Sequence, residues 1–226
     1  MKFPLLLSLA CLIVACSTST RWNGLDPVTE DLPTSRNARY AKAGLIEITE
    51  VDSSIIVDLQ YTGPTNIAKQ ALYESGMPAL LRPITAVRLE KANRILKSQG
   101  YRLVVWDAWR PPSAQYKLWD ASGHDDRFVA NPYSKPSQHS CGTAVDVTLA
   151  DRAGNVLKMP TGFDAFTKDA HARFTNPDPE IEKRKKALQS AMSQAGFYIL
   201  PNEWWHFTDR KFERYPETIS LKQIRE

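Results

Sequence analysis

Two short segments of the sequence carry side chains that could form a hydrolytic metal centre. His139 and Asp146 share one segment, with the flexible Gly142 between them, and Glu203 and His206 share the other. Two histidines and one carboxylate are a common ligand set for catalytic zinc, and a further carboxylate can act as general base. The spacing alone is a weak signal, because four scattered histidines could produce it and a lone histidine more often has a structural role.

These side chains depend on the strands and loops that carry them. The alternating pattern of 144–149 predicts a strand that contains Asp146, and Gly196 precedes two predicted final strands. Helical spacing of apolar residues predicts a helix that begins at Pro83 and ends at Gly100. The full set of expected elements is two short strands within 44–61 broken at 52–54, a helix over 83–99, a strand over 101–106, a helix over 113–121, a loop over 123–137, a strand over 144–149, a turn over 151–154, a helix over 179–195, and strands over 197–200 and 204–208.

Length and composition favour a single globular domain. The chain has 226 residues, of which 42% are hydrophobic and 24% charged, which argues against disorder and against a multi-span membrane protein. Helices and strands are mixed without regular alternation, so we expect an α+β domain with a mixed, mostly antiparallel sheet flanked by helices. The net charge of +4 is too balanced to indicate a nucleic-acid partner. The basic run at 183–186 is interpreted as a solvated helix face, with contact to anionic lipid as the alternative.

The first residues have the pattern of an export signal. Lys2 is followed by an apolar run over 3–15 that is too short to span a bilayer comfortably. The sequence around Cys16 resembles the lipobox of bacterial lipoproteins, in which the cysteine is lipidated; a plain signal peptide with an incidental cysteine is the alternative. We therefore expect a signal peptide over 1–15, a lipidated N-terminus and tether over 16–43, and a catalytic domain over 44–226. Cys141 then remains as the one cysteine of the domain, and no disulfide is expected.

Several motifs together resemble the metallopeptidase family of D-alanyl-D-alanine dipeptidases, the VanX type. The resemblance covers roughly residues 45–216 and keeps the motifs in the order of the family. The wider family includes D,D-carboxypeptidases and L-Ala-D-Glu endopeptidases with the same metal core. The matching motifs are Ser-x-His-x-x-Gly-x-Ala-x-Asp at 137–146, Glu-Trp-Trp-His at 203–206, Trp-Asp-Ala-Trp-Arg-Pro at 106–111, Asp-Leu-Gln-Tyr at 58–61 followed by Asn66, and Phe-Asp at 163–164 after Met159.

The resemblance implies a role for each residue of the metal centre. His139, Asp146 and His206 would bind one Zn²⁺ in a central cleft. Glu203 would accept a proton from water and pass it to the leaving amine, and it faces the same cleft if the strand around it forms. Arg110 would neutralise the oxyanion that forms when water attacks the peptide carbonyl.

The resemblance also implies contacts for the two charged ends of a free dipeptide. Asp164 and the backbone near Tyr61 are candidates for its ammonium group, and Ser137 is the candidate for its carboxylate. A site closed around both ends would exclude longer peptides, since a buried unpaired charge is costly.

The remaining residues with chemical potential have structural interpretations. Asp107 is expected to support Arg110 or nearby backbone, and Cys141 to be a small buried side chain. His124 and His171 are expected to be bystanders, with His171 the plausible substitute metal ligand.

Three functions remain open at this point. The first is a zinc dipeptidase that cleaves D-Ala-D-Ala released from peptidoglycan, and the second is a D,D-carboxypeptidase that trims stem peptides. The third is a non-catalytic lipoprotein that binds peptidoglycan fragments. Ser17 occupies the position where many inner-membrane lipoproteins have a retaining aspartate, so we expect an anchor in the outer membrane that faces the periplasm.

Overall fold

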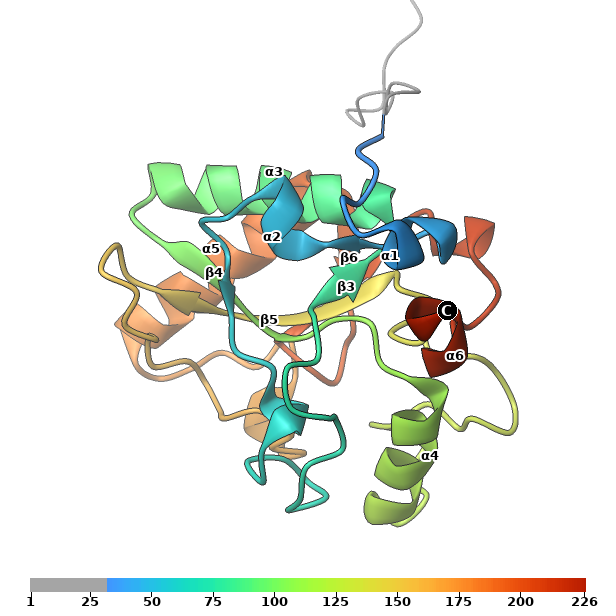
Figure 1. The fold of residues 1–226 in the computed structure, drawn as a ribbon. Helices are drawn as coiled ribbons and strands as arrows, with labels where there is room; N and C mark the ends of the chain where they lie inside the picture. Colours follow the sequence, from blue (N-terminus) through green and yellow to red (C-terminus); the bar gives the residue numbers. More distant parts are fainter. Residues whose placement is uncertain (1–31) are drawn as a thin grey trace, which may run out of the picture.

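A five-stranded sheet forms the centre of the protein, seen in a computed structural model that describes residues 32–226 (Figure 1). Its strand order is β2-β4-β5-β7-β6. β2 pairs with β4 in parallel, and every other pair of neighbours is antiparallel. The sheet is thus mixed and mostly antiparallel, as the sequence predicts. The strands are β2 (Ile56–Val57), β4 (Arg102–Asp107), β5 (Ala144–Ala150), β6 (Phe197–Ile199) and β7 (His206–Asp209).

Two sixteen-residue helices pack beside each other against this sheet (Figure 1). Helix α3 (Pro83–Ser98) begins at a proline, whose fixed φ and missing N–H suit the first helical position. Helix α5 (Pro179–Gln194) is capped by Asp178, whose side chain accepts from the N–H groups of Glu180 and Ile181. Both helices match the sequence predictions within one residue at each end. Buried residues of α3 such as Leu89 and Leu96 enter the main core, and each such side chain contributes about 1.5–3 kcal/mol by its burial.

The segment 44–61 differs from its prediction. Its β-branched residues suggest two strands, and β2 forms, but β1 (Ile46–Glu47) ends after two residues and Ile48–Val51 is the short helix α2. Among residues 32–226, β1 pairs only with β3 (Leu80–Leu81), through the pairs Ile46–Leu81 and Glu47–Leu80. The β-propensity of these residues is not enough to extend β1 beyond its two paired residues. The chain instead forms a short helix that buries Ile48.

The shorter elements surround this central unit. Helix α4 (Pro112–Ala121) projects away from α3, and α1 (Ala38–Lys42) packs against α6 (Leu221–Arg225) (Figure 1). Part of the segment expected to be a tether is therefore folded. The 3-10 turns are η1 (Gln60–Thr62), η2 (Lys168–Ala170) and η3 (Phe212–Arg214).

The expected signal peptide and Cys16 lie outside the described residues. Between residues 32 and 226, no helix is both long enough and apolar enough to cross a membrane.

Candidate metal centre and active site

Three adjacent strands place three of the polar side chains in one row. Asp146 on β5 is the cross-strand partner of Asp107 on β4 and of His206 on β7. Side chains of directly opposite residues lie on the same face of a sheet, close enough to interact. The register of β4 against β5 shifts between Val105 and Asp107, which places Asp107 rather than Trp106 opposite Asp146. The sheet therefore builds the centre of the site.

His139 joins this row from the loop that precedes β5. Its backbone carbonyl accepts from the N–H of Arg110, which ties the loop to the end of β4. The loop also requires Gly142, whose φ is +75° and whose added Cβ would lie 2.8 Å from the side chain of Leu45. The position between the two presumed ligands therefore requires glycine, because a larger side chain would clash with Leu45.

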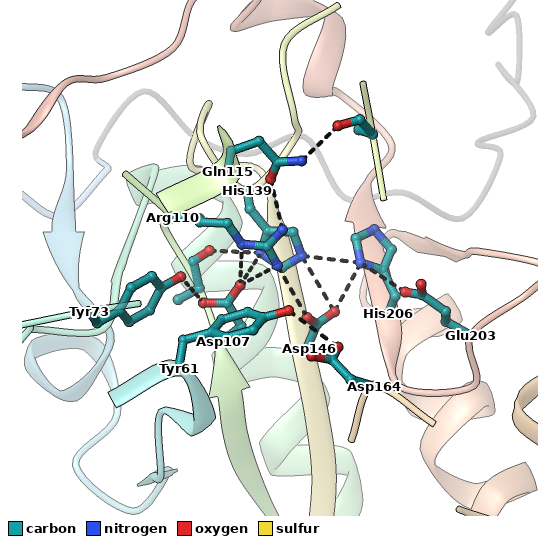
Figure 2. A network of polar contacts seen from close by, with 12 residues as sticks. Tyr61, Tyr73, Asp107, Arg110, Gln115, His139, Asp146, Asp164, Glu203 and His206 are labelled. Carbon is teal, nitrogen blue, oxygen red and sulfur yellow. Dashed lines mark hydrogen bonds and ion pairs between the residues drawn. The ribbon is translucent and has the colours of Figure 1, made fainter. Parts of the chain in front are cut away.

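The ligand atoms of His139, Asp146 and His206 converge within 4.8 Å of one another (Figure 2). His206 Nδ1 lies 2.9 Å from Asp146 Oδ1 and 3.1 Å from His139 Nε2, and His139 Nε2 lies 3.4 Å from Asp146 Oδ1. His139 and Asp146 are buried, with 3% of each exposed. These three residues are the only group of this kind among residues 32–226.

In each presumed histidine ligand, the ring nitrogen that points away from the ligand group has its own hydrogen-bond partner, which fixes the orientation of the ring. His139 Nδ1 donates to the carbonyl of Ala108 at 2.8 Å, which leaves the lone pair of Nε2 facing inward. His206 Nε2 lies 3.1 Å from Thr208 Oγ1, which can accept its proton, and in that tautomer the lone pair of Nδ1 faces inward. Two nitrogen lone pairs and a carboxylate then face one point, and such second partners are typical of metal-binding histidines. The donor set fits zinc, which binds nitrogen and carboxylate oxygen.

The charges of the three groups are coupled. Burial opposes ionisation of Asp146, but the nearby His139 and His206 outweigh it and hold the pKa of Asp146 well below its usual range. Burial disfavours charge on His139, yet Asp146 and Asp107 raise its pKa. Burial lowers the pKa of His206. The ionised carboxylate of Asp146 and the neutral imidazole of His206 are the forms that bind a metal, whereas His139 must release the proton that its raised pKa favours.

Glu203 lies beside the three ligands, although not on a strand. β7 begins at His206, so the prediction of a strand over 204–208 is wrong for Trp204 and Trp205. A turn forms instead, in which the N–H of His206 donates to the carbonyl of Glu203. On an extended strand, residues three apart would face opposite sides of the sheet. The turn brings Glu203 Oε2 to 3.9 Å from His206 Nδ1 (Figure 2).

The environment of Glu203 favours its protonated form. Burial raises the pKa of Glu203 well above its usual range, and the carboxylates of Asp146 and Asp164 raise it further. A carboxylate of raised pKa is a stronger base when it is ionised, which suits a residue that accepts a proton and passes it on.

Arg110 is fixed by partners on two sides. Its Nε and one terminal nitrogen donate to Asp107 Oδ2 at 3.0 and 2.6 Å, and its other terminal nitrogen donates to Gln115 Oε1 at 2.8 Å. A guanidinium has five N–H donors, so two remain for a ligand. The terminal nitrogen that bonds Asp107 also lies 3.8 Å from Asp146 Oδ2, which places one of the free donors beside the metal centre.

Asp107 supports Arg110, as the sequence analysis expects, and it has two further neighbours. Its Oδ1 accepts from the hydroxyl of Tyr73 at 2.5 Å, and its Oδ2 lies 3.3 Å from His139 Nδ1. Tyr73 and Gln115 have no recognisable signal in the sequence, since they lie outside the motif residues that define the site. Gln115 in turn donates to the carbonyl of Ala130 at 2.7 Å, which ties Arg110 to the loop after α4.

Asp164 forms a hydrogen bond with Tyr61, whose ring lies against the guanidinium of Arg110. The hydroxyl of Tyr61 donates to Asp164 Oδ1, and the N–H of Ile67 donates to Asp164 Oδ2, each at 3.2 Å. Burial raises the pKa of Asp164 to about 7. The backbone carbonyl of Tyr61 already accepts from the N–H groups of Leu72 and Tyr73, so its side chain, not its carbonyl, is the group that faces the site.

The other candidate residues separate into near and distant ones. Ser137 is buried two residues before His139. Cys141 is a fully buried free thiol, as expected. His124 and His171 are exposed and do not belong to the ligand group.

Comparisons with known proteins identify the family of this chain. The Peptidase_M15 family model, described as D-ala-D-ala dipeptidase, matches residues 41–224. The D-alanyl-D-alanine dipeptidase of Escherichia coli (strain K12) is 33% identical over 172 residues, which cover 76% of this chain and 88% of that protein. The D-alanyl-D-alanine dipeptidase of Enterococcus faecium is 28% identical over 59% of this chain and 74% of its own length.

Among solved structures, a vancomycin-resistance D,D-pentapeptidase VanY in complex with Zn(II) aligns with 68% of this chain and 88% of that one. Its sequence identity is 16% and its TM-score 0.41. The family match over residues 41–224 and the identity to the Escherichia coli protein establish membership. The chain belongs to the Peptidase_M15 family of D-Ala-D-Ala dipeptidases.

Proposed function

We propose that this protein is a zinc-dependent dipeptidase that hydrolyses free D-Ala-D-Ala to D-alanine. The observation that carries the proposal is the convergence of the lone pairs of His139 Nε2 and His206 Nδ1 with the carboxylate of Asp146, beside a second carboxyl group of raised pKa. One Zn²⁺ per chain is the cation that this donor set favours. Membership of the dipeptidase family supports the choice of substrate.

Glu203 moves the proton in this reaction. When bound, zinc supplies Lewis-acid chemistry that makes water a usable nucleophile near neutral pH. Glu203 accepts a proton from the attacking water through Oε2, which lies 3.9 Å from the presumed ligand atom of His206. As the C–N bond breaks, Glu203 gives this proton to the departing amine, and two molecules of D-alanine result.

Arg110 stabilises the negative charge that forms on the carbonyl oxygen. Its two uncommitted N–H donors provide hydrogen bonds without deprotonating. Asp107 and Gln115 already hold the guanidinium in place, so no reorganisation is needed when the charge develops.

Asp164 and Ser137 recognise the two ends of the dipeptide. The Asp164 carboxylate pairs with the ammonium group, and the Tyr61 hydroxyl that donates to Asp164 Oδ1 holds it in position. The Ser137 hydroxyl donates to the substrate carboxylate. The contact with Asp164 favours a free dipeptide over an N-acylated peptide, which would leave Asp164 buried without its cation.

The ionisation of Asp164 predicts a pH dependence. Its pKa of about 7 lies above that of a free aspartate, so the group is neutral below pH 7 and negatively charged above it. kcat/KM for D-Ala-D-Ala should therefore rise with pH through about 7. In Asp164→Asn, kcat/KM should fall and its rising limb should become shallower, because the ionisation of Asp164 no longer contributes to it. A pH profile of the same steepness in both proteins would contradict this role of Asp164.

The choice of substrate separates the dipeptidase from a D,D-carboxypeptidase. We expect D-Ala-D-Ala to be hydrolysed and both N-acetyl-D-Ala-D-Ala and a stem pentapeptide to be turned over much more slowly. Faster cleavage of the pentapeptide would favour the carboxypeptidase. A protein that binds zinc and hydrolyses none of the three would be a non-catalytic binding protein.

We further propose that the protein is exported and anchored by lipid on Cys16, facing the periplasm from the outer membrane. The support is the sequence pattern of residues 1–17 alone. In this location the enzyme would degrade dipeptide released during peptidoglycan turnover and allow recycling of D-alanine.

The lipid anchor predicts a change of fractionation. Cys16→Ser removes the acylated side chain, and we expect the protein to shift from the membrane pellet to the soluble fraction. The wild-type protein and the Ser17→Ala variant, which retains the cysteine, should stay in the pellet. A Cys16→Ser protein that remains entirely in the pellet would argue against the anchor.

A further inference from the structure

A pocket of about 270 Å³ lies between the first turn of α4 and the segment that leads to His139. Pro112, Gln115 and Tyr116 contribute from α4, and residues 132–137 with Ser140 and Thr218 complete the lining. A water molecule occupies about 30 Å³ in the liquid, so the pocket has room for a side chain of several atoms.

Two lining residues connect this pocket to the active site. Gln115 lines the pocket and also accepts the hydrogen bond from Arg110 at 2.8 Å (Figure 2). Ser137 lines it too, two residues before His139. Under the proposed function Ser137 contacts the carboxylate of the substrate, so the pocket borders the carboxyl-terminal residue of the dipeptide.

The lining offers hydrogen-bond donors without matching acceptors. Ser140 is 1% exposed and its Oγ has no hydrogen-bond partner among the described residues. An unpartnered buried hydroxyl normally costs about 1–3 kcal/mol, so a ligand that bonds to it would gain. Lys135 is the one charged side chain in the lining, it forms no ion pair with residues 32–226, and no carboxylate lines the pocket. Lys135 is exposed, and an anionic group of a ligand would supply an acceptor for both Lys135 and Ser140.

We infer that this pocket receives the side chain of the carboxyl-terminal D-residue and favours a side chain that carries a carboxylate. The inference rests on the proposed function, since the orientation of the dipeptide comes from it. Lys135 provides the countercharge, Ser140 a hydrogen bond, and the edge-to-face pair of Tyr116 and Tyr133, with ring centroids 5.2 Å apart, an aromatic wall. The enzyme then accepts D-Ala-D-Glu in addition to D-Ala-D-Ala.

The test measures kcat/KM for D-Ala-D-Glu, D-Ala-D-Gln and D-Ala-D-Lys in the zinc-loaded enzyme. We expect the wild type to prefer D-Ala-D-Glu over D-Ala-D-Lys. In Lys135→Glu the ratio of these two values should fall at least tenfold, which corresponds to about 1.4 kcal/mol. Lys117→Glu is the matched control, because Lys117 is an exposed lysine on α4 that does not line the pocket, and it should keep the wild-type ratio.

Ser140→Ala provides a second variant that does not depend on charge. It removes a hydroxyl without a partner, so the fold should not weaken, and the ratio of D-Ala-D-Glu to D-Ala-D-Ala turnover should fall several-fold. An unchanged Glu-to-Lys ratio in Lys135→Glu, or an equal change in Lys117→Glu, would overturn the inference. Failure to hydrolyse D-Ala-D-Glu while D-Ala-D-Ala is cleaved would also overturn it. Failure on D-Ala-D-Ala itself would instead count against the proposed function.

Discussion

Replacing Glu203 with glutamine should lower kcat for D-Ala-D-Ala by about 10²–10⁴-fold, the range of general acid–base catalysis. Glutamine keeps the size and hydrogen-bonding capacity of the side chain but cannot accept and release a proton. Glu203 lies beside the ligand group without belonging to it, so the variant should retain zinc. Steady-state kinetics together with the zinc content of the purified protein measure both expectations.

The control for this substitution is Glu180→Gln, which makes the same change on the exposed first turn of α5. It should keep wild-type turnover. A Glu203→Gln variant with wild-type kcat would remove Glu203 from the mechanism. Loss of zinc together with loss of activity would mean that Glu203 holds the metal instead of moving the proton.

Asp146→Ala should abolish zinc binding and lower turnover at least about 100-fold. The metal contributes several kcal/mol of transition-state stabilisation, and each 1.36 kcal/mol is a factor of ten in rate. Asp146 also supplies the negative charge between His139 and His206, whose nitrogens lie 3.1 Å apart. Without this charge the two buried imidazoles cannot offset the charge of a divalent cation.

Zinc content and thermal unfolding distinguish this result from a general loss of structure. Zinc should raise the Tm of the wild type, because a ligand that binds only the folded state stabilises it. At a free zinc concentration of a hundred times Kd, the free energy of unfolding rises by about 2.7 kcal/mol. Zinc should leave the Tm of Asp146→Ala unchanged. Asp126→Ala, at an exposed loop position, should behave as the wild type does. Full zinc occupancy in Asp146→Ala would refute the proposed ligand set.

Local sequence signals predict the helices and strands that position the site. They predict the contacts between these elements less well. Pro83 and Gly100 define the limits of α3, and the alternation of 144–149 identifies β5. The first of the two strands expected within 44–61 ends at Glu47 instead of reaching the break at 52–54, because β-branched residues indicate a strand only where a partner strand is available. The turn at Glu203 was missed for a related reason: it depends on contacts such as that between the N–H of Trp204 and the carbonyl of Ala170.

The residues of the metal centre can be predicted from sequence motifs. The residues that hold them in place by hydrogen bonds cannot. His139, Asp146, His206 and Arg110 stand within recognisable motifs. Tyr73 and Gln115 hold Asp107 and Arg110 in place through hydrogen bonds to residues that belong to other elements. Such contacts are set by register and loop packing, which composition and periodicity do not encode.

The measurement that tests the central claim most directly is the turnover of D-Ala-D-Ala by the wild-type enzyme, before and after chelation and after zinc is added back. The ligand geometry of His139, Asp146 and His206 predicts that chelation abolishes hydrolysis and that about one equivalent of zinc per chain restores it. Hydrolysis that persists in protein shown to be free of metal would contradict the account.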